Sequence, residues 1–120
     1  MKFQGILTAL VTPMDEQFQV DEAKLRQLVN IQIDSGIHGL VMLGGTGEYA
    51  ALSAEERQRA VRIAKEEAAG RVPVVAGVLE PGFGECLKAC KKSKKLEKSF
   101  HCAIPAEVYD KLEEEFHAGE

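Results

Sequence analysis

Short apolar runs alternate with longer segments of helical periodicity along most of this chain. Three runs have the length of buried strands: Gly5–Thr12, Gly39–Leu43 and Val72–Val78. Between them, apolar residues recur every three or four positions, which predicts helices with one buried face. Because strands alternate with helices, the pattern predicts βα units and a parallel sheet.

The first predicted helix begins after Asp21 and ends at Ser35-Gly36. Aspartate is a favourable N-cap, and Val20 and Leu25 are spaced as a hydrophobic staple across the first turn. Gly36 is suited to the left-handed conformation that ends many helices. The buried face is predicted to carry Leu25, Leu28, Val29 and Ile33.

The second predicted helix spans Ala54–Ala69, and a third spans Glu85–Lys95. Ser53 and Glu56 form a capping box, in which each side chain is expected to bind the backbone N–H of the other residue. Gly70 is expected to end the second helix. One face of that helix carries Ala60, Val61, Ala64 and Ala68.

The composition and the hydrophobic pattern of the chain change after Lys91. No fourth apolar run like Gly39–Leu43 follows, and the next residues are mostly charged. Pro105 is suited to the first position of a last helix. That helix would have a narrow apolar seam of Val108, Leu112 and Phe116 and an otherwise acidic surface. We therefore divide the chain into residues 1–91, a partial α/β domain, and residues 92–120, a divergent charged tail.

Composition limits the class of protein. A chain of 120 residues is long enough for one domain at most. Its content of 45% apolar and 28% charged residues, with a net charge of −4, is ordinary for a globular protein. We expect neither a membrane segment nor a signal peptide, and three cysteines favour a reducing compartment such as the cytoplasm. The lysine-rich stretch Lys88–Lys98 has no interleaved aromatic residues, so we expect a solvated helix face and no nucleic-acid partner.

The segment Gly44-Gly45-Thr46-Gly47-Glu48, called here the glycine loop, joins the second strand to the second helix. Glycine permits positive φ and lets a ligand approach the backbone closely. Successive N–H groups in such a loop form a concave cluster suited to a carboxylate or phosphate. In isolation, however, a glycine loop is more often a structural turn. Tyr49 follows directly, and substrate contact and core packing are equally open for it.

A metal centre is not expected. The candidate ligands Cys86, Cys90, His101 and Cys102 follow none of the spacings typical of zinc sites. Adjacent residues such as His101 and Cys102 rarely bind one ion together. Buried or idle thiols are the favoured interpretation.

At this point residues 5–91 resemble the dihydrodipicolinate synthase/N-acetylneuraminate lyase family, and its synthase branch most closely. The glycine loop is the most specific match, because it lies in register with matching segments on both sides. The matching segments are Gly5–Met14, Asp34–Gly36, Gly44–Glu48, Leu52-Ser53 and Arg71–Gly77.

The resemblance implies a fold and a reaction. Members are (β/α)8 barrels, usually tetrameric, that join or cleave pyruvate and an aldehyde through a lysine Schiff base without a further cofactor. It implies that the N–H groups of Gly45 and Thr46 and the Thr46 hydroxyl bind the pyruvate carboxylate. Gly44, Gly47 and Glu48 would shape the loop, with Glu48 bonding loop amides. The resemblance also makes a homo-oligomer of this chain possible.

The chain departs from the family pattern at three places. Gly45 stands where the family usually has threonine or serine, whose hydroxyl joins a proton relay. Val78–Gly82 replaces the family's Gly-Ala-Asn-Ser/Thr, which weakens any expectation of feedback inhibition by lysine. The relay tyrosine and the Schiff-base lysine, on the family's fifth and sixth strands, have no counterpart here.

We therefore expect a partial (β/α)8 TIM barrel: three parallel βα units and a helical C-terminal tail, arising from truncation or a frameshift. By resemblance the function is condensation of pyruvate with aspartate semialdehyde, with no turnover by the chain alone. The alternatives are a fragment of another 2-keto acid aldolase such as N-acetylneuraminate lyase, a non-catalytic carboxylate-binding module, or an interaction protein.

Overall fold

The computed structural model describes residues 4–96 and 101–102. Strands and helices alternate along the described chain, and the strands form one parallel sheet in the order β1-β2-β3-β4. The elements are β1 (Leu7–Ala9), α1 (Glu22–Asp34), β2 (Gly39–Met42), the 3-10 helix η1 (Tyr49–Ala51), α2 (Ala54–Ala68), β3 (Val74–Ala76), α3 (Phe83–Leu96) and β4 (His101–Cys102).

The predicted βα architecture is confirmed, and the sheet extends one strand further than the sequence predicts. β4 pairs with β3 in parallel, with Val75 opposite His101 and Ala76 opposite Cys102. A two-residue strand needs only backbone hydrogen bonds to its neighbour, so it leaves no apolar run in the sequence. The three predicted βα units are thus present, and β4 adds a short strand that no apolar run like Gly39–Leu43 announces. The boundary at residue 91 stays a prediction, and α3 continues through it to Leu96. The helix predicted after Pro105 lies outside the described residues.

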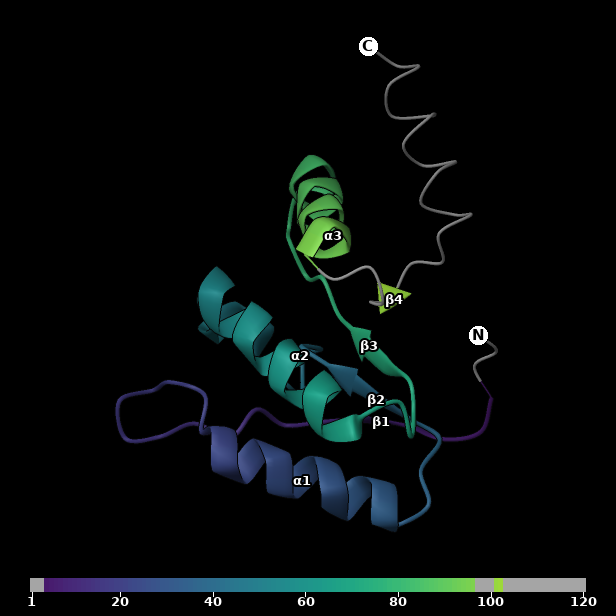
Figure 1. Ribbon diagram of the computed structural model, residues 1–120. Helices are drawn as coiled ribbons and strands as arrows, with labels where there is room; N and C mark the ends of the chain where they lie inside the picture. The colour runs from purple at the N-terminus through teal and green to yellow at the C-terminus, as the bar shows by residue number, and fades with distance from the viewer. Residues whose placement is uncertain (1–3, 97–100, 103–120) are drawn as a thin grey trace.

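α1 and α2 lie side by side on one face of the sheet (Figure 1). Leu25 and Val29 of α1 are fully buried, as the apolar stripe predicts, and Leu28 and Ile33 pack against the same core. The predicted face of α2 is also confirmed, because Ala60, Val61, Ala64 and Ala68 are all buried. The small residues of α2 allow its axis to lie close to the strands.

The helix ends largely follow the predicted signals. Asp21 caps α1 by accepting a hydrogen bond from the Lys24 backbone N–H, and Gly36 follows with a φ of 87°. At the end of α2 the left-handed turn starts one residue early, at Ala69 with a φ of 48°, and continues through Gly70.

β1 is less buried than its apolar sequence predicts. Leu7 and Thr8 are half-buried, and Ala9 is exposed. Within the described part of the sheet, β1 pairs only with β2, so it forms one edge. The central strands are covered better: Leu40 and Met42 of β2 are fully buried, which explains why their apolar run was the clearest strand signal.

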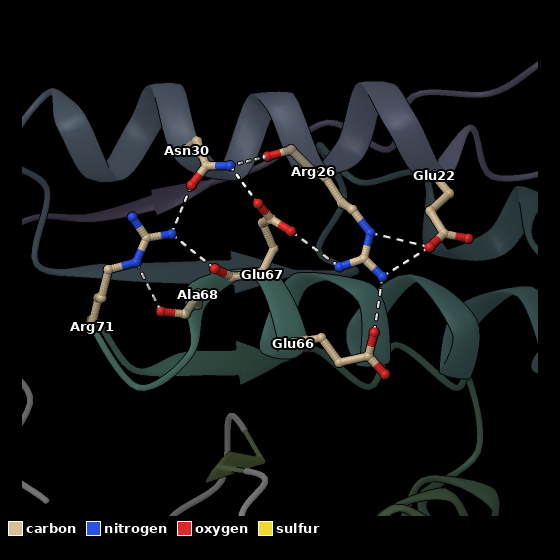
Figure 2. A network of polar contacts seen from close by, with 7 residues as sticks. All are labelled: Glu22, Arg26, Asn30, Glu66, Glu67, Ala68 and Arg71. Carbon is tan, nitrogen blue, oxygen red and sulfur yellow. Dashed lines mark hydrogen bonds and ion pairs between the residues drawn. The ribbon is translucent and has the colours of Figure 1, made fainter.

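Polar side chains join α1 to α2 along their exposed faces. Arg26 of α1 contacts Glu66 and Glu67 of α2 at 2.9 and 3.1 Å, and Asn30 donates to Glu67 at 2.6 Å (Figure 2). Arg71 closes the row by donating to the Asn30 side-chain oxygen at 2.7 Å. This network holds the two helices in register above their buried faces.

Candidate functional site

The glycine loop follows β2 at the carboxyl edge of the parallel sheet, where ligands bind in α/β folds. η1 and the capped start of α2 come directly after it. Ser53 accepts a hydrogen bond from the Glu56 backbone N–H at 3.2 Å, as predicted. The second predicted bond of the capping box, from the Ser53 backbone N–H to the Glu56 carboxylate, was wrong. That carboxylate instead accepts from the Val20 backbone N–H at 2.6 Å. Glu56 thus ties the start of α2 to the start of α1.

The left-handed residues around the loop are not glycines. Leu43, just before the loop, and Glu48, its last residue, have φ values of 61° and 57°, whereas Gly44, Gly45 and Gly47 are not among the glycines with positive φ. The positive φ that glycine permits is therefore not used at these three positions. A bulky residue such as Leu43 adopts this conformation at a cost, so surrounding contacts must hold it.

Two glycines are needed at this edge because backbones approach closely there. A Cβ on Gly47 would lie 3.0 Å from the Leu43 nitrogen, and one on Gly77 would lie 2.7 Å from the Leu43 carbonyl oxygen. The Gly77 N–H also donates to the Met42 carbonyl at 2.8 Å. The loop after β3 therefore packs directly on the strained end of β2.

The remaining part of the loop is open. A Cβ on Gly44 or Gly45 would meet nothing within 4 Å, and Gly45 and Thr46 are exposed. Among the hydrogen bonds of the described residues, none has the backbone N–H of Gly45 or Thr46 as its donor. These are the donors that the resemblance assigns to a carboxylate, and both belong to exposed residues.

Glu48 shapes the loop through its backbone. Its N–H donates to the Gly45 carbonyl at 3.1 Å, and its carbonyl accepts from the Ala51 N–H at 3.0 Å. The Glu48 side chain is exposed and makes no capping hydrogen bond to η1. A role for its carboxylate in binding loop amides receives no support from this arrangement.

Thr12 is a contributor that the sequence pattern did not single out. Its buried hydroxyl donates to the Gly47 carbonyl at 2.7 Å, which ties the end of the β1 segment to the glycine loop. A polar residue that closes an apolar strand next to a proline is a recognisable signal, because a buried hydroxyl needs a partner.

Tyr49, Arg57 and Glu80 form a second group beside the loop. The Tyr49 hydroxyl donates to a Glu80 carboxylate oxygen at 2.7 Å, and the same oxygen accepts from Arg57 at 3.0 Å. The Arg57 guanidinium lies 3.7 Å from the centre of the Tyr49 ring and donates through Nε to the Tyr49 carbonyl at 2.9 Å. The sequence left two roles open for Tyr49, substrate contact and core packing. Because Tyr49 is only 5% exposed, the structure favours core packing.

Burial first, and then the hydrogen bond to Glu80, raise the pKa of Tyr49 to about 12. The phenol therefore stays protonated over the physiological range and acts as a hydrogen-bond donor. Arg57 and Glu80 were missed by the sequence analysis because they are distant in the chain, and no local pattern joins a helix residue to a loop after the next strand.

No described lysine lies at the carboxyl end of a strand. Every lysine in residues 4–96 belongs to a helix: Lys24 to α1, Lys65 to α2 and the others to α3. Lys24 and Lys88 pair with Asp21 and Glu85 at 3.4 and 3.3 Å on exposed surfaces. Formation of a Schiff base needs an unprotonated amine, which desolvation favours. A solvated, ion-paired ammonium group is therefore a poor nucleophile.

Cys86 is half-buried and Cys90 buried in α3, and within the described residues no group of three or more His, Cys, Asp or Glu could hold a metal ion. In the same part of the chain, every helix is too short or too polar to cross a membrane.

Comparison with known proteins places this arrangement in a family. A model of the Dihydrodipicolinate synthetase family matches residues 2–105. The 4-hydroxy-tetrahydrodipicolinate synthase of Maridesulfovibrio salexigens is 44% identical over 94 residues, which are 78% of this chain and 32% of that protein.

Two solved structures are similar. Chloride-inhibited dihydrodipicolinate synthase from Acinetobacter baumannii, complexed with pyruvate, matches with a TM-score of 0.75 and 34% identity over 79% of this chain and 33% of the other. N-acetylneuraminate lyase from Mycoplasma synoviae matches with a TM-score of 0.69 and 28% identity over 78% of this chain and 33% of the other. This chain thus spans about a third of the length of these relatives. It belongs to the dihydrodipicolinate synthetase family.

Proposed function

We propose that this chain provides the carboxylate-binding part of a pyruvate-dependent class I aldolase site. By family, the reaction is that of 4-hydroxy-tetrahydrodipicolinate synthase, which condenses pyruvate with aspartate semialdehyde through a lysine Schiff base. The observation that supports this most directly is the pair of open N–H groups at Gly45 and Thr46 on the carboxyl edge of the sheet. A solved relative complexed with pyruvate favours the same ligand.

The chemistry of the loop suits an anion. Two successive N–H groups and one hydroxyl can donate to the two oxygens of a carboxylate, and hydrogen bonds to charged groups are stronger than neutral ones. The Thr12 and Gly77 hydrogen bonds hold the surrounding backbone before a ligand arrives. Preorganised donors bind an anion without a reorganisation cost at the moment of binding.

The chain by itself is proposed to bind pyruvate without turning it over. Its described lysines lie in helices and not at a strand end beside the loop. None of the lysines in the described residues is therefore placed to supply the amine of a Schiff base. Borohydride treatment with pyruvate followed by mass spectrometry tests this directly. We expect no gain in mass, and a stable pyruvyl adduct on any lysine would contradict the proposal.

Binding is tested by titrating pyruvate into ¹⁵N-labelled chain and following the amide signals of Gly45 and Thr46. We expect saturable shifts at both. Thr46→Val removes the hydroxyl at similar volume and should weaken binding about tenfold or more, since a hydrogen bond to a charged group contributes about 1.5–3 kcal/mol. Thr46→Ser keeps the hydroxyl and serves as the matched control. Shifts confined to residues far from the loop would reject this site.

A second candidate is another 2-keto acid aldolase, because N-acetylneuraminate lyase is also among the similar structures. The proposed contacts bind only the keto-acid carboxylate, so they are common to both activities. Pyruvate binding therefore tests the shared step, while the choice of aldehyde depends on contacts to the second substrate.

A further inference from the structure

We infer that Arg57 is a positioning residue that holds the glycine loop in its anion-binding conformation, an inference that rests on the proposed carboxylate site. Arg57 lies in the first turns of α2 and makes no contact with Gly45 or Thr46 among its hydrogen bonds and ion pairs. Its contacts are instead with the residue that follows the loop and with the loop after β3.

The glycine loop needs such support because of its backbone. Leu43 and Glu48 both adopt left-handed conformations, and each costs free energy relative to an ordinary backbone. Without tertiary contacts the segment would relax toward cheaper conformations. The Thr12 hydroxyl holds Gly47 from the β1 side, and the Gly77 N–H holds Met42 from the β3 side.

Arg57 provides the contact from the helix side. Its Nε donates to the carbonyl of Tyr49, one residue beyond left-handed Glu48, and its guanidinium covers the Tyr49 ring at 3.7 Å. A planar fork can make the Nε hydrogen bond, stack on the ring and still donate to a carboxylate. A lysine ammonium has no such geometry.

Glu80 anchors the other end of the guanidinium. One Glu80 oxygen accepts from both Arg57 and the Tyr49 hydroxyl, so three residues from η1, α2 and the loop after β3 form a closed set of contacts. Their side chains are largely shielded, with 20% of Arg57 and 27% of Glu80 exposed. Shielding strengthens the ion pair relative to one on an open surface.

The test compares two arginines of the same helix. Arg57→Met removes the donor to the Tyr49 carbonyl, whereas Arg59→Met removes a similar donor to the Val20 carbonyl, at 2.8 Å, away from the loop. We expect Arg57→Met to raise the pyruvate dissociation constant at least fivefold and Arg59→Met to change it less than twofold. Arg57→Lys should recover little of the loss. Equal weakening by both methionine variants would overturn the inference, because general destabilisation would explain it.

A ligand-free measurement separates this inference from the proposed function. The Glu48 N–H is hydrogen-bonded to the Gly45 carbonyl, so its hydrogen exchange reports the closed loop. Exchange at Glu48 should accelerate in Arg57→Met and not in Arg59→Met. Unchanged exchange would overturn the positioning role. If the wild-type chain fails to bind pyruvate while Glu48 still responds, the proposed function fails and the positioning of the loop stands.

Discussion

Leu43 shows how a single residue can organise the carboxyl edge of the sheet. It is buried, it adopts a left-handed backbone, and its main chain lies against both Gly47 and Gly77. Those two glycines are present because a side chain would collide with backbone atoms. Gly45, in contrast, faces open space and is free to take a side chain without a clash.

This difference predicts opposite results for two glycine-to-alanine substitutions. Gly77→Ala should destabilise the chain by about 1–3 kcal/mol, because backbone atoms must move to admit the methyl group. Gly45→Ala should leave stability unchanged within about 0.5 kcal/mol, since its φ is not positive and no atom lies near the new Cβ. Urea unfolding followed by circular dichroism measures both. Similar losses at the two positions would contradict the described packing.

At the scale of elements, the pairing of α1 with α2 combines a buried apolar contact with an exposed charged one. Arg26 bonds Glu22 on its own helix and Glu66 and Glu67 on the other (Figure 2). The Asn30 amide first, and then Arg26, hold the pKa of Glu67 below its usual value, and Arg26 does the same for the pKa of Glu22. The network therefore depends on ionised carboxylates.

The sign of its pH dependence follows. Carboxyl groups with a pKa lowered by folding stabilise the native state above their unfolded pKa of about 4.3, and this stabilisation is lost as pH falls through the folded values. We expect Arg26→Met to lower the thermal midpoint at pH 7 and to lower it much less at pH 3. Arg62→Met, at an exposed position of α2, is the control. An equal loss at both pH values would show that Arg26 acts by packing alone.

At the scale of the molecule, the described sheet has an open edge at β1. Ala9 is exposed in the strand, and Ile6 and Val11 beside it are 64% and 52% exposed. An unpaired edge with apolar neighbours favours association with another strand. Since this chain spans about a third of its relatives' length, such association is the expected behaviour of the 120 residues in isolation.

Sedimentation velocity at several concentrations tests this expectation. The wild-type chain should associate as concentration rises, and Ile6→Lys should shift it toward the monomer, because a charge directly beside an edge strand opposes pairing. Gln4→Lys, at another exposed position, is the matched control for added charge. A wild-type chain that stays monomeric throughout would show that the β1 edge is not adhesive.

Local patterns sufficed to predict the order of elements, the caps at Asp21 and Ser53, and the buried faces of α1 and α2. These depend on neighbours in sequence, where periodicity and capping chemistry act directly. The glycine loop and its resemblance to the dihydrodipicolinate synthetase family were also recognisable, because both depend on a short contiguous segment. The same locality explains the failures. β4 was missed because two paired residues leave no pattern, and β1 was expected to be buried because an apolar run does not reveal whether a neighbour covers it.

Only the tertiary structure decided how the loop is held. Positive φ fell on Leu43 and Glu48 and not on the glycines, Glu56 bound the distant Val20, and Tyr49 joined Arg57 and Glu80. Each of these is a contact between segments that the fold brings together across a sheet or between helices. The sequence by itself determined where the glycine loop lies and which family it resembles, because one contiguous segment carries both. The packing of remote residues determined the conformation of the loop, because Leu43 and Glu48 keep a left-handed backbone only where surrounding contacts hold them.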